Sequence, residues 1–144
     1  MKNKILIGLL LTTCVSFSQT NITWNDLAKV TFEEKFLPAY DEAFLVPTFS
    51  NTLKALEGKY VTIKGYFLNI APEEKIYILS KGPMSSCFFC GVGGPETAVE
   101  LEFDNTQNFK TDNIVLVTGK LKLNAVDVDH FNYILTDCTL KLTQ

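Results

Sequence analysis

The fold of this chain is decided by residues 57–68, which read EGKYVTIKGYFL. Every second residue from Val61 to Phe67 is apolar or glycine, whereas Lys64 between them is charged, and this period of two is typical of a half-buried strand. Gly65 stands inside the pattern, and a glycine inside a strand often marks a bend or a bulge. The stretch therefore predicts a long, bent strand of the kind that closes a small barrel.

Four further segments alternate in a strand-like way: residues 75–80, 98–103, 113–124 and 131–142. Gly119 lies inside the fourth predicted strand and indicates a second bend. A short helix is predicted over residues 50–56, because Ser50 can cap its start and Gly58 can end it. This order predicts an all-β fold, a five-stranded OB-type Greek-key barrel that occupies residues 50–144.

Residues 19–49 show a mixed pattern, with aromatic residues placed among acidic residues and lysines. We expect an irregular N-terminal arm here. Its aromatic side chains should cover the outside of the barrel, because aromatic residues dominate the burial energy of small domains.

Residues 1–18 are predicted to be a signal peptide. Lys2 and Lys4 form a short positive start, Ile5–Leu11 is apolar, and small residues precede an expected cleavage site before Gln19. We therefore expect the protein to be exported, either to a periplasm or to the outside. No stretch has the roughly 18–20 apolar residues that a membrane-spanning helix needs.

Cys14 opens an alternative, because residues 11–14 loosely resemble a lipoprotein processing site. Thr13 stands where glycine, alanine or serine is usual, so lipidation is the weaker alternative. Without the leader, eleven lysines and sixteen acidic residues remain, and arginine is absent from the whole chain. Nucleic-acid binding normally uses a basic face rich in arginine, so we expect no nucleic-acid partner.

Three segments resemble those of secreted bacterial OB-fold proteins: residues 57–66, residues 117–120 (VTGK) and residues 133–138 (YILTDC). The N-terminal Trp24-Asn25-Asp26-Leu27 and the cysteine-containing loop resemble, more narrowly, an uncharacterised family of bacterial periplasmic proteins. The resemblance implies the barrel fold and export, and it implies no activity.

The most informative loop is predicted between the second and third strands, at residues 83–96, which read PMSSCFFCGVGGPE. Cys87 and Cys90 are separated by two residues, so both sulfurs can point at one metal ion or form a tight disulfide. Zinc is the expected ion, and copper is the alternative because thiolates also select Cu(I). Structural zinc takes four ligands, so further ligands are needed.

The candidates for the further metal ligands are Cys138, His130, Asp129 and Glu96. His130 and Cys138 lie about 26 Å apart along an extended strand, so both cannot readily join the cysteine pair. We choose Cys138, because a third thiolate suits a soft metal. The simpler interpretations are a core cysteine at 138, a turn histidine at 130 and a solvated glutamate at 96.

Two other interpretations of the cysteine pair stay open. A reactive dithiol is usually placed at the start of a helix, and Gly91–Pro95 is no helix start. A structural disulfide would only staple the loop.

The sequence therefore predicts an exported metal-binding OB-type protein. The alternative is a non-catalytic binding module for a peptide, a glycan or a partner protein. We do not expect an enzyme, because no hydrolase motif surrounds any serine and the chain has one histidine.

Overall fold

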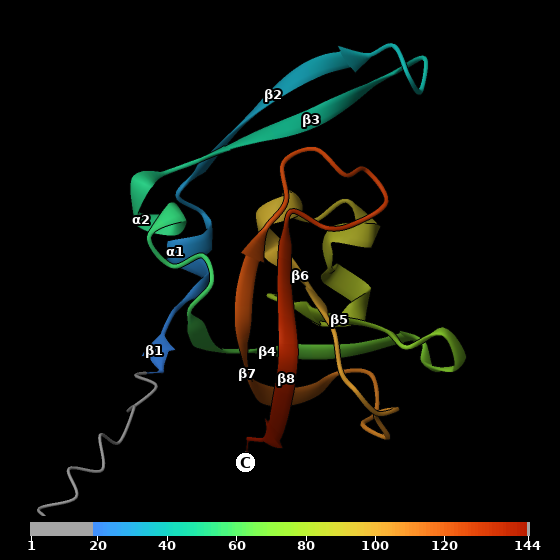
Figure 1. The fold of residues 1–144 in the computed structure, drawn as a ribbon. Coiled ribbons are helices and arrows are strands. Elements are labelled where there is room, and N and C mark those ends of the chain that lie inside the picture. The colour runs from blue at the N-terminus through green and yellow to red at the C-terminus, as the bar shows by residue number, and fades with distance from the viewer. Residues whose placement is uncertain (1–18, 144) are drawn as a thin grey trace, which may run out of the picture.

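The computed structural model describes residues 19–143, so the predicted leader lies outside the described residues. Strands make up about half of this part of the chain, and they form a barrel with a hairpin projecting above it (Figure 1). The elements are β1 (Thr20–Asn21), α1 (Trp24–Leu27), β2 (Val30–Leu37), β3 (Glu42–Phe49), α2 (Asn51–Lys54), β4 (Tyr60–Ala71), β5 (Ile76–Ser80), β6 (Ala98–Leu101), β7 (Asn113–Leu123) and β8 (Tyr133–Leu142). Four 3-10 turns are η1 (Pro72–Glu74), η2 (Met84–Ser86), η3 (Phe88–Cys90) and η4 (Pro95–Thr97).

The barrel closes through β4, β5, β6, β8, β7 and back to β4. All of these pairings are antiparallel except that of β6 with β8, which is parallel. The first barrel strand, β4, thus pairs with both the second and the fourth, and the third pairs with the fifth, as in an OB fold. The predicted fold class is confirmed. The short β1 pairs in parallel with the start of β4, at Val61 and Thr62.

β4 is long because its two halves pair with different strands. Residues 60–67 pair with β7, and residues 66–71 pair with β5. Gly65 lies where the pairing changes, and a Cβ atom there would lie 2.7 Å from the Ser80 carbonyl oxygen and 2.9 Å from the Trp24 ring. The indole Nε1 of Trp24 donates a 2.8 Å hydrogen bond to the Lys64 carbonyl oxygen. Gly65 therefore permits α1 and β5 to approach the strand closely.

Gly119 marks the predicted second irregularity. Thr118 pairs with Thr139 and Lys120 pairs with Thr136, so two residues of β8 lie opposite one residue of β7. One of the two, Asp137, has a left-handed backbone with φ of 52°. This is a β-bulge, and it confirms the expectation drawn from the glycine.

The buried residues form two clusters. The main cluster fills the barrel and continues to Leu27 of α1 and Leu53 of α2. Tyr133 ties α1 to this cluster, because its hydroxyl donates a 2.6 Å hydrogen bond to the Leu27 carbonyl oxygen. Burial raises the pKa of the Tyr133 hydroxyl well above its ordinary value. The smaller cluster contains Leu68, Ile78, Cys87 and Ala98, with Phe88 and Phe131 packed against it.

The smaller cluster explains where the cysteine loop sits. Successive side chains of a strand point to opposite faces, so Leu68 and Ile78 point outward where Phe67 and Leu79 point into the barrel. Cys87 packs on these outward residues. The cysteine loop therefore covers the outer face of β4, β5 and β6.

The N-terminal arm is more regular than expected, because β2 and β3 form an antiparallel hairpin that pairs residues 30–37 with residues 42–49. Its outer aromatic residues do not cover the barrel, since Phe36 and Tyr40 are 59% and 51% exposed. Trp24 and Phe49, nearer the ends of the arm, do pack against the main cluster. The hairpin escaped sequence analysis because its apolar residues occur on both faces, so no simple period of two appears.

The predicted short helix is present. The Ser50 hydroxyl oxygen accepts a 3.4 Å hydrogen bond from the Leu53 amide, and Gly58 has a left-handed φ of 77°.

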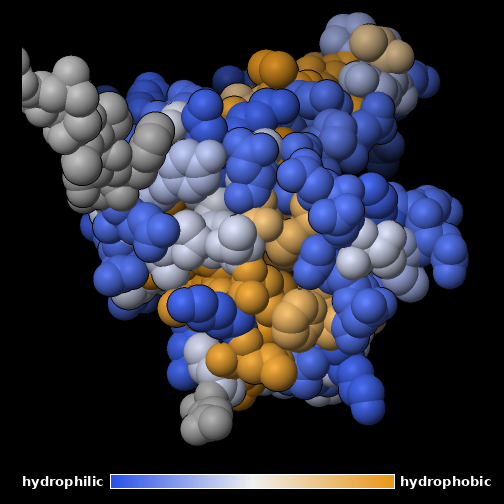
Figure 2. Space-filling model, turned by 60° about the horizontal axis from the view of Figure 1, so that its bottom comes forward, coloured by the Kyte–Doolittle hydropathy of each residue, from blue (hydrophilic) through white to orange (hydrophobic). Residues whose placement is uncertain are grey.

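On the face that lies at the bottom of Figure 1, apolar residues gather in the middle (Figure 2). No helix within residues 19–143 is long and apolar enough to cross a membrane.

Candidate functional site

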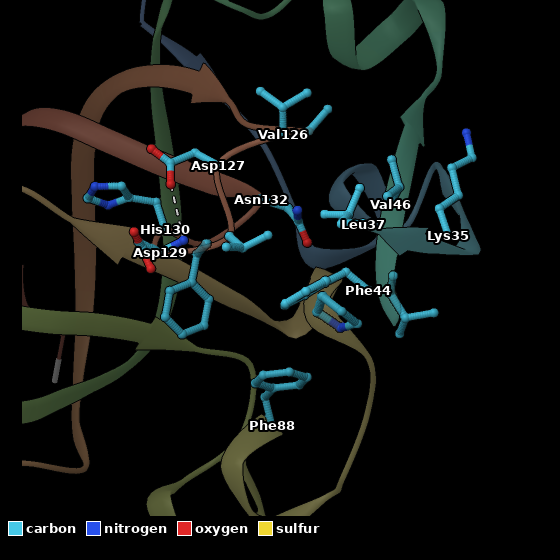
Figure 3. A pocket seen from close by; sticks show the side chains of 15 residues that line it. Lys35, Leu37, Phe44, Val46, Phe88, Val126, Asp127, Asp129, His130 and Asn132 are labelled. Atoms are coloured by element: carbon cyan, nitrogen blue, oxygen red, sulfur yellow. Dashed lines mark hydrogen bonds between the residues drawn. The ribbon is translucent and has the colours of Figure 1, made fainter. Parts of the chain in front are cut away.

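A pocket of about 440 Å³ lies between the hairpin and one end of the barrel. Figure 3 shows Phe44 and Val46 of the hairpin on one side of the pocket, Asp127 and His130 on the other, and Phe88 below. Its walls come from the hairpin (Lys35, Leu37, Phe44, Leu45, Val46), from the loop between β7 and β8 (residues 125–132) and from Phe88 and Pro95. Three segments that are far apart in the sequence thus build one site.

The β7–β8 loop keeps its shape through Asn124, a buried residue at the end of β7. Its Nδ2 donates to the carbonyl oxygens of Asp127, His130 and Phe131 at 2.7, 3.2 and 3.3 Å. Its Oδ1 accepts from the amides of Val126 and Asp127 at 3.2 and 2.9 Å. Sequence analysis missed Asn124, because an asparagine before a loop is common and nothing in the pattern marks it as buried.

An aromatic cluster joins the cysteine loop to the β7–β8 loop. Phe88, Phe89 and Phe131 contact one another edge to face, with ring centroids 5.9 to 6.3 Å apart. Phe88 and Phe131 also line the pocket. Sequence analysis considered only the spacing of the cysteines and missed the role of the two residues between them. Phe88 and Phe89 pack on Phe131 and so hold the cysteine loop against the pocket.

Cys87 and Cys90 lie together, as their spacing predicts. Both thiols donate to the Met84 carbonyl oxygen at 3.2 Å, so the sulfurs are separated by at most twice that distance. The turn between them is closed by a 3.0 Å hydrogen bond from the Cys90 amide to the Cys87 carbonyl oxygen, and it ends at Gly91 with φ of 76°. Cys87 is buried, Cys90 is exposed, and both are free thiols.

Cys138 is placed elsewhere. It packs against the main cluster, its thiol donates to the Leu135 carbonyl oxygen at 3.0 Å, and its sulfur lies 2.9 Å from where a Cβ of Gly119 would be. Burial raises the pKa of this thiol to about 12. The position matches the core-cysteine interpretation, and the bulge turns the side chain toward Gly119 rather than toward the cysteine loop.

Glu96 lies in η4, the turn that contacts α1. Its charge contributes to the raised pKa of Tyr133. Within residues 19–143, no three His, Cys, Asp or Glu side chains are grouped so that they could hold a metal ion. The structure therefore brings Cys87 and Cys90 together without Cys138, His130 or Glu96.

His130 lies at the edge of the pocket and pairs with Glu100 of β6. Its Nδ1 lies 2.8 Å from Glu100 Oε1, and the Phe131 amide donates to Glu100 Oε2 at 3.1 Å. The hydrogen bond to Glu100 is the main cause that raises the pKa of His130 above its ordinary value of 6.5, and the Glu100 charge adds to it. The pair fixes one side of the β7–β8 loop to the barrel.

We expect proton NMR of the His130 ring to give a pKa above 6.5, and Glu100→Gln to lower it. Because the folded pKa is raised, the stability from the charged pair is fully present below the unfolded pKa and is lost as the pH rises through the folded pKa. Asp127→Asn removes a weaker influence and should lower the pKa less. An unchanged titration in Glu100→Gln would contradict the pairing.

The fold defines an OB-type β-barrel protein. No family model, curated protein or solved structure matches the chain.

Proposed function

We propose that the protein is an exported binding module that holds an extended peptide between the hairpin and the barrel. The observation that carries the proposal is the pocket, which has mainly apolar walls and lies against one face of the hairpin. OB barrels commonly bind ligands beside the loop that joins their fourth and fifth strands. In this chain that loop is the β7–β8 loop, which supplies half of the pocket.

The hairpin offers a strand edge to a ligand. Within residues 19–143, β2 and β3 pair only with each other, so each keeps one unpaired edge. Lys35, Leu37, Phe44 and Val46 line the pocket from one face of the hairpin, because Lys35 lies opposite Phe44 and each of the other two is two residues from one of them along its strand. The unpaired edge of β3 bounds that face. A peptide that adds a strand there would form main-chain hydrogen bonds and place alternate side chains in the pocket.

The walls indicate the chemistry of the peptide. Leu37, Phe44 and Phe88 offer apolar surface, which suits aliphatic or aromatic side chains of the ligand. Asp127 and Asp129 are exposed at the rim, and the chain has a net charge of −3. We therefore propose a peptide in which apolar residues alternate with lysine or arginine. A glycan fits less well, because its hydroxyl groups need many polar partners.

Phe44→Ala should weaken peptide binding about tenfold or more, because a central aromatic wall is removed. The probe is a fluorescein-labelled Lys-Val-Lys-Phe-Lys-Val peptide, measured by fluorescence anisotropy. Phe36→Ala is the matched control, since Phe36 is on the same hairpin, is 59% exposed and does not line the pocket.

Three comparisons can contradict the peptide proposal. Equal binding of a peptide with glutamate in place of lysine would exclude the role of Asp127 and Asp129. Equal loss in Phe36→Ala and Phe44→Ala would show that the pocket is not the site. Tighter binding of a maltooligosaccharide than of the peptide would favour the glycan alternative.

Metal binding at the cysteine loop is a second candidate function. Its support is separate from the pocket: two thiols in one short turn share the Met84 carbonyl oxygen as their acceptor.

A further inference from the structure

The cysteine loop holds its two sulfurs in place before any ligand arrives. The Met84 carbonyl oxygen accepts from both thiols, and the Met84 amide donates a 2.7 Å hydrogen bond to the Asp112 carboxylate. Cys87 is fixed by its packing on Leu68, Ile78 and Ala98. A site organised in this way loses little conformational entropy when it binds an ion.

Within residues 19–143, no His, Asp or Glu side chain is grouped with Cys87 and Cys90 as a third metal ligand. Cys87 packs in a hydrophobic cluster with Leu68, Ile78 and Ala98, so one side of the site is apolar. The ligands first expected to complete the shell are engaged elsewhere: Cys138 packs against the main cluster, and His130 pairs with Glu100. Zinc is normally held by four ligands, whereas thiolates select Cu(I) among the softer ions.

We propose that Cys87 and Cys90 bind one Cu(I) ion as two thiolates, without Cys138 or His130. This inference rests on metal binding at the cysteine loop, and it names the ion and its ligands. Binding converts two thiols and Cu(I) into a bis-thiolate complex with a net charge of −1 and releases two protons. No electron is transferred. The exposed Cys90 gives the ion a path from solvent, and the apolar residues around Cys87 shield one side of the complex from water.

The Met84 carbonyl oxygen loses both of its thiol donors when the ion binds. The hydrogen bond from the Met84 amide to the Asp112 carboxylate does not involve the sulfurs, so the loop keeps this attachment to the barrel.

The test uses the full chain purified from the exported fraction, reduced and kept free of oxygen. Cu(I), supplied as its acetonitrile complex, is titrated in competition with the chelator bathocuproine disulfonate, and Zn(II) is titrated separately. We expect one Cu(I) per chain and two sulfur ligands by X-ray absorption. Cys90→Ser should weaken binding more than about 100-fold, because a direct ligand matters at least as much as the groups that orient it.

Cys90→Ser is the decisive variant, because Cys90 is exposed and its change leaves the cores intact, whereas Cys87→Ser alters a buried residue. Cys138→Ser and His130→Ala should keep Cu(I) affinity within a few-fold of the unmodified chain. A zinc site tighter than the copper site, or Cu(I) loss in His130→Ala or Cys138→Ser, would overturn this inference and leave metal binding in place. Binding of neither ion would overturn both.

Discussion

Replacement of Gly65 by valine is expected to remove about 3 kcal/mol or more of the free energy of unfolding, a large part of the ~5–15 kcal/mol typical of a domain. A Cβ at this position would lie 2.7 Å from the Ser80 carbonyl oxygen, 2.9 Å from Leu79 Cγ and 2.9 Å from the Trp24 ring. The Ser80 oxygen belongs to the backbone of β5, so it cannot move without disturbing the barrel pairing. Trp24 would be pushed away, and its hydrogen bond to Lys64 would be lost.

The loss at Gly65 is measured by urea unfolding followed by circular dichroism. Lys64→Val is the matched control, because Lys64 is the next residue of β4 and its side chain is exposed. The control should change stability by less than about 0.5 kcal/mol, as is usual for surface substitutions. A Gly65→Val variant within about 1 kcal/mol of the unmodified chain would show that β5 and α1 do not approach β4 as described.

Replacement of Asn124 by aspartate is expected to have the second large effect, about 2–4 kcal/mol in the free energy of unfolding. The amide nitrogen donates to three carbonyl oxygens, and a carboxylate oxygen in its place would face those oxygens with no proton to share. The β7–β8 loop would lose its shape, so peptide binding should weaken together with stability. This combination separates Asn124 from Gly65, which lies away from the pocket lining.

The effect of Asn124→Asp should depend on pH. A buried carboxylate that faces carbonyl oxygens has a raised pKa in the folded state, so the penalty is greatest at neutral pH and shrinks as the carboxyl is protonated. Unfolding curves at pH 7 and pH 4.5 measure this. Asn25→Asp is the control, because Asn25 is exposed in α1. Equal stability of Asn124→Asp and Asn25→Asp at neutral pH would show that the Asn124 hydrogen bonds do not hold the loop.

The barrel could be predicted because its signal is local. The side chains of each barrel strand alternate between the core and solvent, so the sequence alone indicates that residues such as Val115 and Val117 point inward. Gly119 predicted the bulge because a glycine inside a strand pattern often marks one, and in the structure a Cβ there would lie 2.9 Å from Cys138 Sγ and 3.0 Å from Leu135 Cβ. The hairpin was missed for the opposite reason: β2 and β3 pair with each other outside the barrel and have no consistently buried face, so their apolar residues show no clear period.

The candidate site could be predicted only in part. The spacing of Cys87 and Cys90 was sufficient to bring their sulfurs together, because two residues between cysteines leave room for a single turn. Cys138 is far from them along the chain, and its inward position on β8 placed it in the core. The pocket had no sequence signal, because its walls come from three separate segments.

The sequence by itself determined the five barrel strands, their faces and the convergence of Cys87 with Cys90, since each depends on the spacing of neighbouring residues. Only the tertiary structure decided which distant segments meet. It placed Phe88 against Phe131, gave the Asn124 side chain its five hydrogen bonds and set the hairpin opposite the β7–β8 loop. These contacts depend on the closure of the barrel and the packing of its loops, which local periodicity does not encode.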